Sequence, residues 1–290
     1  MLSSWLFLAI SIALIVFVSG LFQGALGFGY AIAALTTLPL LVAPRQAHII
    51  ISLSGIPVMA MAAWTFRGGA DWRAIRPALL GGLISLPIGL LTFSLVSADG
   101  LIRGTGLAIL IVMLLELMPS PRQARHFRFL HSPFVAGLVS GYLAGAVSIG
   151  GPPIVAYALK QSWSPLRTKA FITGSLLLVS LCKGIGLFAG NFVMPATLGL
   201  SLLAIPFAIG GVWLGARLGL WLSTVHYRRI VALILVTLSC WWLYRGAGKP
   251  ASAPAMELPK VATRSSPGTA SIALANLQAQ QHAPNSGHDR

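Results

Sequence analysis

Two short glycine-containing stretches of this sequence could bind an anion. They are Gly27-Phe28-Gly29 and Gly150-Gly151-Pro152-Pro153, and each lies within a long apolar run. Because glycine adopts backbone angles that other residues avoid and proline cannot continue the hydrogen-bond ladder of a helix, each stretch predicts a broken helix. The half-helix after a break begins with free N–H groups, whose partial positive charge attracts anions. The candidate substrate-binding residues in and around the breaks are Gln23, Gly24, Gly27, Gly29, Gly145, Ser148, Gly150, Gly151 and Pro152, and Lys183 in a separate apolar run is a further candidate.

Several of these candidates also have a structural interpretation, which the sequence leaves open. Gly24 and Gly145 belong to glycines spaced four residues apart, which is typical of closely packed membrane helices. Gln23 and Ser148 could form hydrogen bonds between helices instead of contacting a ligand. Lys183 lies inside an apolar run with no acidic residue near it in the sequence. It either faces an anion in a transport pathway or extends from near a helix end to the membrane surface.

The composition indicates a membrane protein. Of the 290 residues, 56% are hydrophobic and 9% are charged, whereas a soluble domain has about 25% charged residues. The formal charge of +15 would suggest nucleic-acid binding in a soluble protein. Here the basic residues lie between apolar runs, which is typical of membrane-protein loops. We therefore expect an all-α, polytopic helical protein that crosses a membrane several times and binds no nucleic acid.

An internal repeat divides the chain. A shift of 121 residues places Val18-Ser19-Gly20 on Val139-Ser140-Gly141, and six of the twelve positions from 18 to 29 are then identical. The same shift places Pro44 on Pro165. This predicts two related membrane repeats, a basic cytoplasmic linker between them and a disordered tail rich in Ala, Ser, Pro and Gln. The predicted units are residues 1–118, 119–131, 132–245 and 246–290.

The distribution of basic residues predicts how the repeats cross the membrane. If 133–158 crosses once, the basic residues show no preference for one face; if it enters and returns, twelve lie on one face and two on the other. The positive-inside rule favours the second arrangement. Residues 133–158, and by the repeat residues 5–43, should therefore each form a helical hairpin that is broken at its glycines. One broken hairpin and three full transmembrane spans per repeat would invert the two repeats relative to each other, as in many secondary transporters.

The chain resembles the TauE/SafE sulfite exporter family of membrane permeases. The resemblance rests on a glycine-rich motif that begins each half, present as Gly141-x-x-x-Gly145-x-x-x-x-Gly150-Gly151-Pro152-Pro153 and as Gly20-x-x-x-Gly24-x-x-Gly27-x-Gly29. In the first copy, Tyr30 replaces the second glycine of a pair. The resemblance covers about residues 10–245, and it implies transport of small sulfur-containing anions, such as sulfite and sulfonates, across the cytoplasmic membrane.

No motif for other chemistry accompanies the glycine breaks. The sequence has no phosphate-binding loop, no His-Glu-x-x-His helix and no cysteine cluster, and we expect its histidines in loops or in the tail. The sequence therefore predicts no enzymatic activity, no cofactor and no bound metal. The resulting prediction is a transporter of small anions, organosulfur or sulfite-like, that works in the lipid bilayer passively or by coupling to an ion gradient. An anion channel and a non-transporting scaffold or regulatory subunit are the alternatives, and a homodimer is an arrangement that the sequence allows.

Overall fold

The computed structural model describes residues 2–117, 132–158 and 160–218, together with Thr237, Cys240, Leu243 and Tyr244. The described residues are 88% helical and contain no strand. This confirms the predicted all-α fold. The predicted linker 119–131 and tail 246–290 lie outside the described residues, as does nearly all of the second repeat beyond residue 218.

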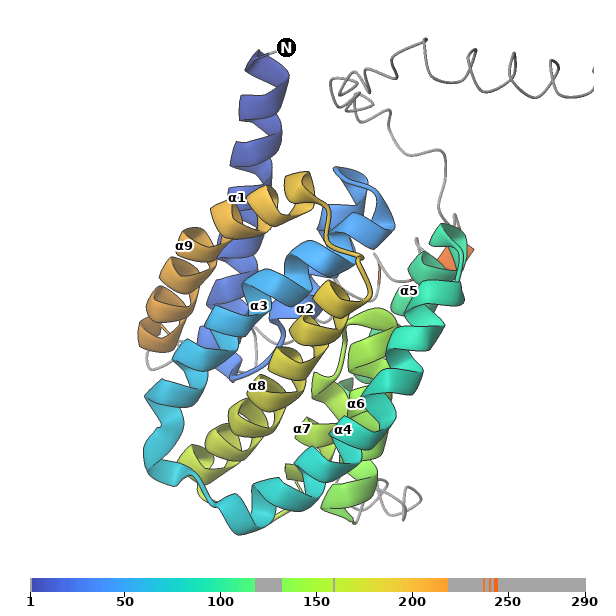
Figure 1. Cartoon of the computed structure of the whole chain (residues 1–290). Helices are drawn as coiled ribbons and strands as arrows, with labels where there is room; N and C mark the ends of the chain where they lie inside the picture. Colours follow the sequence, from blue (N-terminus) through green and yellow to red (C-terminus); the bar gives the residue numbers. More distant parts are fainter. Residues whose placement is uncertain are drawn as a thin grey trace, which may run out of the picture. The chain divides into compact units, whose positions relative to one another are not determined.

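The described part of the chain contains long apolar helices and two short helices that follow breaks (Figure 1). In chain order the elements are α1 (Leu2–Leu26), α2 (Tyr30–Thr37), η1 (Leu38–Leu40), α3 (Pro44–Phe66), η2 (Arg67–Gly69), α4 (Trp72–Leu95), α5 (Ala98–Leu117), α6 (Pro133–Val147), α7 (Gly151–Ala158), α8 (Pro165–Ala189) and α9 (Pro195–Leu218). Proline begins α3, α6 and α8, where its missing N–H removes no helical hydrogen bond.

Five of the described helices are long and apolar enough to cross a membrane. The apolar segments are Leu6–Ala25, Pro44–Gly69, Trp72–Leu95, Pro165–Ala189 and Pro195–Leu218. Large apolar side chains are exposed on their outer faces, as at Leu80, Ile84, Ile88 and Leu91 of α4. Because these four residues recur about once per turn, they form one apolar stripe that suits contact with lipid. The chain is therefore a polytopic helical membrane protein.

Both predicted breaks are present. The first separates α1 from α2 at Gly27 and Gly29, whose φ angles are +84° and +110°. The second separates α6 from α7, and there Ser148 has a φ of +59°. Glycine adopts positive φ readily and most other residues avoid it. Ser148 therefore holds a strained backbone conformation at the second break.

The first helix of each hairpin packs against a long helix of the other half. The α1 helix packs against α9 through Gly20 and Gly24, and α6 packs against α4 through Gly137, Gly141 and Gly145. At each of these glycines, an added Cβ would meet backbone atoms of the facing helix. This is the small-residue packing expected between membrane helices. It joins the two halves along two separate seams.

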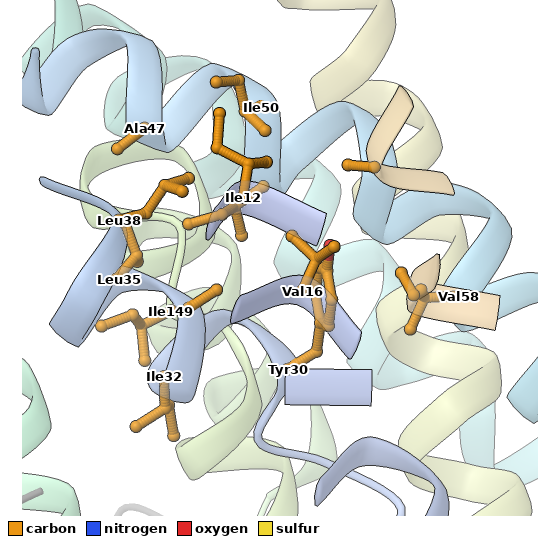
Figure 2. Close-up of a cluster of buried hydrophobic side chains, with 14 of the residues drawn as sticks. Ile12, Val16, Tyr30, Ile32, Leu35, Leu38, Ala47, Ile50, Val58 and Ile149 are labelled. Carbon is orange, nitrogen blue, oxygen red and sulfur yellow. The ribbon is translucent and has the colours of Figure 1, made fainter. Parts of the chain in front are cut away.

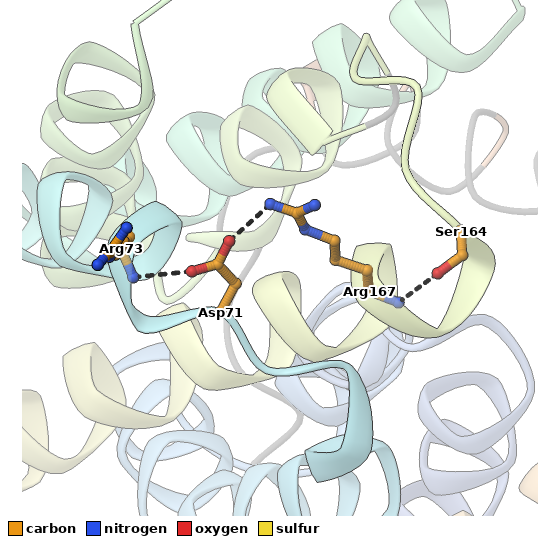
Figure 3. Close-up of polar contacts among 4 residues, drawn as sticks. All are labelled: Asp71, Arg73, Ser164 and Arg167. Atoms are coloured by element: carbon orange, nitrogen blue, oxygen red, sulfur yellow. Dashed lines mark hydrogen bonds and ion pairs between the residues drawn. The ribbon is translucent and has the colours of Figure 1, made fainter.

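Contacts near the helix ends show the direction in which each helix runs. Gly137 and then Gly145 of α6 face successive parts of α4, from its start toward its end, so these two helices run in the same direction. In the first turn of α8, Arg167 forms an ion pair of 2.6 Å with Asp71, which caps the start of α4 (Figure 3). The starts of α6 and α8 thus lie at the same end of the helix bundle. The chain between them enters the bundle and returns.

The first half has the reverse orientation. Gly20 and Gly24 of α1 face successive turns of α9, so these helices also run in the same direction. Arg45 at the start of α3 donates hydrogen bonds to the carbonyl groups of Ser94 (3.3 Å) and Val96 (3.0 Å) at the end of α4. The α3 helix therefore begins at the end of the bundle opposite to the start of α8. Since α9 follows α8 through a short loop, α9 and α1 begin at that opposite end too. The contacts thus place the entrances of the two hairpins at opposite ends of the bundle, while the inverted repeat and its orientation in a membrane stay predictions.

The two breaks share one apolar core (Figure 2). Ile12 and Val16 of α1, Tyr30 of α2 and Ile50 of α3 are buried in it, and Ile149 from the second break belongs to the same cluster. Lipid tails are as apolar as these side chains, so close packing stabilises such a core more than exclusion from water does. The core brings together two breaks that lie far apart in the sequence.

Candidate functional site

A cavity of about 70 Å³ lies where the two breaks meet. Its wall includes Gly29 from the first break and Ser148, Gly150 and Gly151 from the second, and side chains of α3 and α8 complete it. One water molecule needs about 10–15 Å³ of such space. The cavity therefore has room for several waters or for a small oxyanion.

The side chain of Gln23 closes the first break. Its Nε2 donates to the carbonyl oxygen of Gly27 over 2.9 Å, and the backbone N–H of Tyr30 donates to its Oε1 over 3.2 Å. Gln23 is fully buried, and it satisfies two backbone groups that the break leaves without helical partners. Gln23 thus stabilises the break, and it also lines the cavity.

The start of α2 offers N–H groups to the cavity. The first hydrogen bond of this helix runs from Ala33 N to Gly29 O at 3.0 Å. The amides of Ala31 and Ile32 precede it in the sequence and have no partner within the helix. Both residues line the cavity. The partial positive charge of the helix start therefore favours an anion there.

The second break carries a charged group. Lys183 of α8 is 4% exposed, and its Nζ donates to the Ser148 hydroxyl over 2.6 Å. The ammonium group lies inside the bundle beside the cavity, which excludes the alternative in which Lys183 reaches the membrane surface. A buried charge is costly unless it is paired. The position of Lys183 therefore favours a negatively charged ligand.

Ser148 connects Lys183 to His48 of α3. The His48 Nδ1 lies 3.0 Å from the Ser148 Oγ, and the His48 Nε2 lies 3.2 Å from the Thr105 Oγ1. The Thr105 hydroxyl donates to the Leu101 carbonyl over 2.7 Å, so its oxygen accepts from His48, and Nε2 carries the ring proton. Nδ1 then accepts from Ser148, whose oxygen in turn accepts from Lys183. Hydrogen bonds therefore connect Lys183 through Ser148 and His48 to Thr105 in α5.

The start of α7 offers fewer amides than the start of α2. The helix begins with Gly151-Pro152-Pro153, and proline has no N–H group. Only the first of these three residues can donate a backbone hydrogen bond. At the second break, attraction for an anion therefore depends mainly on the side chains of Lys183 and Ser148.

No carboxylate side chain lines the cavity in the described part of the chain. The carboxylates whose side chains are described are Asp71 and Asp99. Each forms an ion pair, with Arg167 at 2.6 Å and with Arg103 at 2.7 Å. Lys183 is thus the one charged side chain among the described residues that lines the cavity.

The structure places the predicted binding residues in two groups. Those that line the cavity are Gln23, Gly29, Ser148, Gly150, Gly151 and Lys183. Gly24 and Gly145 instead pack against α9 and α4, respectively. These contacts agree with the interpretation of both glycines as helix-packing residues. Gly27 faces the side chain of Lys169, and Pro152 is buried in α7 away from the cavity wall. Anion binding by the first group stays a prediction.

The prediction that His48 lies in a loop is wrong. This histidine lies one turn after Pro44 in α3 and is 1% exposed. Two signals were available in the sequence. Proline favours the first turn of a helix, which places residue 48 inside α3. In addition, His48, Ser52, Gly55 and Met59 recur at helical spacing, and the last three line the cavity.

A known family covers most of the chain. The family model described as Sulfite exporter TauE/SafE matches residues 12–241. This range contains both breaks and all residues that line the cavity. No curated protein and no solved structure gives a significant match.

Proposed function

Because this chain belongs to the TauE/SafE sulfite exporter family, we propose that it transports a small sulfur-containing anion, such as sulfite or an alkanesulfonate, through the cavity between its two breaks. Membership of the family implies a membrane exporter of sulfite or related anions. The proposal adds a binding site for the anion. The anion binds between the Lys183 ammonium, the Ser148 hydroxyl and the first amides of α2.

The observation that carries this proposal is the buried ammonium group of Lys183 at the cavity. Charged side chains inside the membrane part of a protein are rare and mark functional sites by default. The cavity wall has one positive charge and no carboxylate among its described residues. A bound anion with one negative charge would neutralise it. Sulfonates and hydrogen sulfite have that charge and are small enough for the cavity.

The orientation of the two hairpins supports a carrier mechanism. Transporters with inverted repeats expose one central site alternately to the two sides of the membrane, and they form it from broken helices near the bilayer midplane. Here the two broken hairpins enter from opposite ends of the bundle, and both contribute to one cavity. Alternating access around this cavity is therefore the mechanism that we propose.

Flux measurements in proteoliposomes test the proposal. The purified protein is reconstituted and offered sulfite, methanesulfonate, sulfate or acetate, with protein-free liposomes as the control. We expect saturable uptake and counterflow of sulfite or methanesulfonate. Flux that rises linearly with concentration and shows no counterflow would indicate a channel. Absence of flux for every anion would contradict transport and favour the scaffold alternative.

Cysteine labelling tests the proposed orientation in the membrane. After Cys182 and Cys240 are replaced by serine, Ser162→Cys marks the α7–α8 loop and Met194→Cys marks the start of the α9 region; both positions are exposed. Because the α7–α8 end carries most of the basic residues, we expect it on the cytoplasmic side. A membrane-impermeant maleimide added to intact cells should label position 194 but not position 162. The opposite labelling would contradict the orientation.

A further inference from the structure

The cavity contains a base but no described acid to balance it. The structure gives Lys183 one hydrogen bond, to the uncharged hydroxyl of Ser148. The described carboxylates, Asp71 and Asp99, pair with arginines away from the cavity. At this cavity the ammonium form of Lys183 is stabilised while an anion is bound beside it. When the anion leaves, the neutral amine is the less costly form, because an isolated charge is strongly disfavoured in a low-dielectric interior.

Few titratable groups face Lys183 from the elements packed around it. The α3 helix contributes His48, which shares the hydroxyl of Ser148 with the lysine. The α2 helix contributes Tyr30, which lines the cavity and hydrogen-bonds to Ser54 at 2.7 Å. The described parts of α4, α6 and α7 pack against α8 but place no titratable side chain on the cavity wall. Among the described residues, His48 is therefore the proton-exchanging group that is connected to Lys183.

The geometry of this connection suits proton transfer. Ser148 lies between the two bases, 2.6 Å from the Lys183 Nζ and 3.0 Å from the His48 Nδ1. A hydroxyl can accept one proton while it donates another. Thr105 accepts from the other ring nitrogen of His48 and so orients the ring with Nδ1 toward Ser148. The chain Lys183–Ser148–His48 is thus a short proton path that ends at the cavity.

We propose that the protein carries its anion together with one proton held by Lys183, and that His48 delivers this proton through the Ser148 hydroxyl. The proposal rests on the anion site described under the proposed function. In the transfer, the proton on Nδ1 of the His48 imidazolium moves to the Ser148 oxygen, and the Ser148 hydroxyl proton bonds to the lone pair of the Lys183 amine. Ser148 ends as a hydroxyl, His48 as a neutral imidazole and Lys183 as an ammonium.

Such coupling keeps the cavity neutral in both forms of the carrier. The loaded form contains an ammonium group and an anion of one negative charge. The empty form contains a neutral amine. Because a charge that moves through the membrane interior without a partner is costly, both forms reorient more easily than a form with an uncompensated charge. The proton is therefore a co-substrate at the anion site.

Isothermal titration calorimetry of the full-length protein measures this proton. Methanesulfonate is the main probe, because it stays ionised near neutral pH and any proton taken up belongs to the protein. Sulfite is the second probe, with a correction for its own ionisation. The buffers are imidazole, Bis-Tris and Tris, which differ in ionisation enthalpy and contain no sulfonate that could compete. The dependence of the binding enthalpy on the buffer should show uptake of about one proton per anion.

Two substitutions on α8 separate the role of Lys183 from a general effect of lysine. Lys183→Arg keeps a permanent positive charge, so anion binding should persist while proton uptake falls close to zero. Lys169→Arg, on the same helix and away from the cavity wall, should match the wild type.

Wild-type binding without proton uptake would overturn the proposal, whether or not the arginine variant folds. Proton uptake by Lys183→Arg equal to that of the wild type would overturn the role of Lys183. If none of the tested anions binds or is transported, the proposed function itself fails, and this proposal fails with it.

The path through His48 has a separate test. His48→Asn should leave equilibrium proton uptake intact and slow anion flux after a pH jump in proteoliposomes by about tenfold, because Lys183 then lacks its proton donor. Thr105→Val removes only the acceptor that orients the ring, and it should slow flux in the same direction but less. Unchanged flux in both variants would overturn the path.

Discussion

The two breaks lie at matching positions of the repeat but contact different side chains. The shift of 121 residues that relates the two halves places Gly27 on Ser148 and His48 on Lys169. In the structure, Gly27 faces Lys169 near the start of α8, and Ser148 contacts His48 near the start of α3. These two contacts are therefore counterparts in the two halves. Only the second of them joins a hydrogen-bond chain that reaches the cavity.

The polar groups that serve each break also differ. Lys183 corresponds to Ala62, which is buried in α3, so the first break has no charged counterpart. Gln23 corresponds to Ala144, so the second break has no amide side chain at this position. There the Ser140 hydroxyl donates to the carbonyl of Gly150 instead. The repeat thus sets the geometry of the cavity, while single residues stabilise the first break and place a charge at the second.

The largest expected effect concerns the charge that only the second break has. Lys183→Met should weaken methanesulfonate binding by more than about 100-fold, which is about 2.7 kcal/mol, because no other described charge lines the cavity. Calorimetry measures the affinity. The unfolding temperature without anion should stay the same or rise, since a buried amino group without a carboxylate partner is replaced by an apolar side chain. Affinity close to that of the wild type would contradict the proposed site and remove the main difference between the breaks.

The next effect concerns glycines that the two hairpins share. Gly24 and Gly145 are counterparts, and a Cβ at either position would meet the backbone of the facing helix. Overpacking of this kind costs about 1–3 kcal/mol, so alanine at either position should lower the unfolding temperature to a similar extent. Gly151→Ala is the control, because its Cβ would lie 3.8 Å from Leu176 without a clash. If alanine lowers the unfolding temperature at only one of the two positions, the two halves are less alike than these contacts indicate.

A smaller pair of effects should separate stabilisation from binding. Gln23→Leu leaves the Gly27 carbonyl and the Tyr30 amide buried without their partner, which costs about 1–3 kcal/mol in the free energy of unfolding. Ser148→Gly relieves the positive φ at this position, which offsets part of the cost of leaving Lys183 and His48 without the hydroxyl, so it should lower stability less than Gln23→Leu does. It removes a hydroxyl next to Lys183 and should weaken anion binding by about tenfold. The reverse result, with stability lost at Ser148 and affinity lost at Gln23, would contradict the division of roles.

The smallest effect is expected at the counterpart of His48. The Lys169 ammonium lies 5.0 Å from the centre of the Phe66 ring, outside the cavity wall. Lys169→Met should therefore cost only about 0.5–1 kcal/mol of stability and should leave the affinity for methanesulfonate unchanged. Thermal unfolding and calorimetry measure the two quantities. A large loss of affinity would mean that the first break also uses a charge.

The two helix breaks were predicted correctly because they depend on local backbone chemistry. Gly150-Gly151-Pro152-Pro153 predicts a helix break because proline and glycine restrict or free the backbone wherever they occur. The roles of Gly24 and Gly145 do not follow from the sequence, because glycine spacing alone does not show whether a glycine faces a neighbouring helix or a cavity. Both glycines pack against helices of the other half of the chain, and no nearby sequence pattern identifies those helices.

The side chains around Lys183 show a second limit. His48, Ser52 and Met59 follow helical spacing, so the sequence contains the information that they share one face of a helix. The sequence does not show which other segment of the chain packs against that face. Ser148 lies 100 positions from His48, and its contact with that residue exists only because α3 packs beside the second break.

The class of protein and the two breaks follow from the amino-acid sequence alone, which also predicts the division into two halves. These follow from apolar runs, from proline and glycine, and from a repeated motif, all of which act through neighbouring residues or through the surrounding lipid. Only the tertiary structure decided which glycines face the cavity, that Lys183 points inward, and that His48 joins it through Ser148. These features depend on distances between segments far apart in the chain, and the packing of the two hairpins sets those distances.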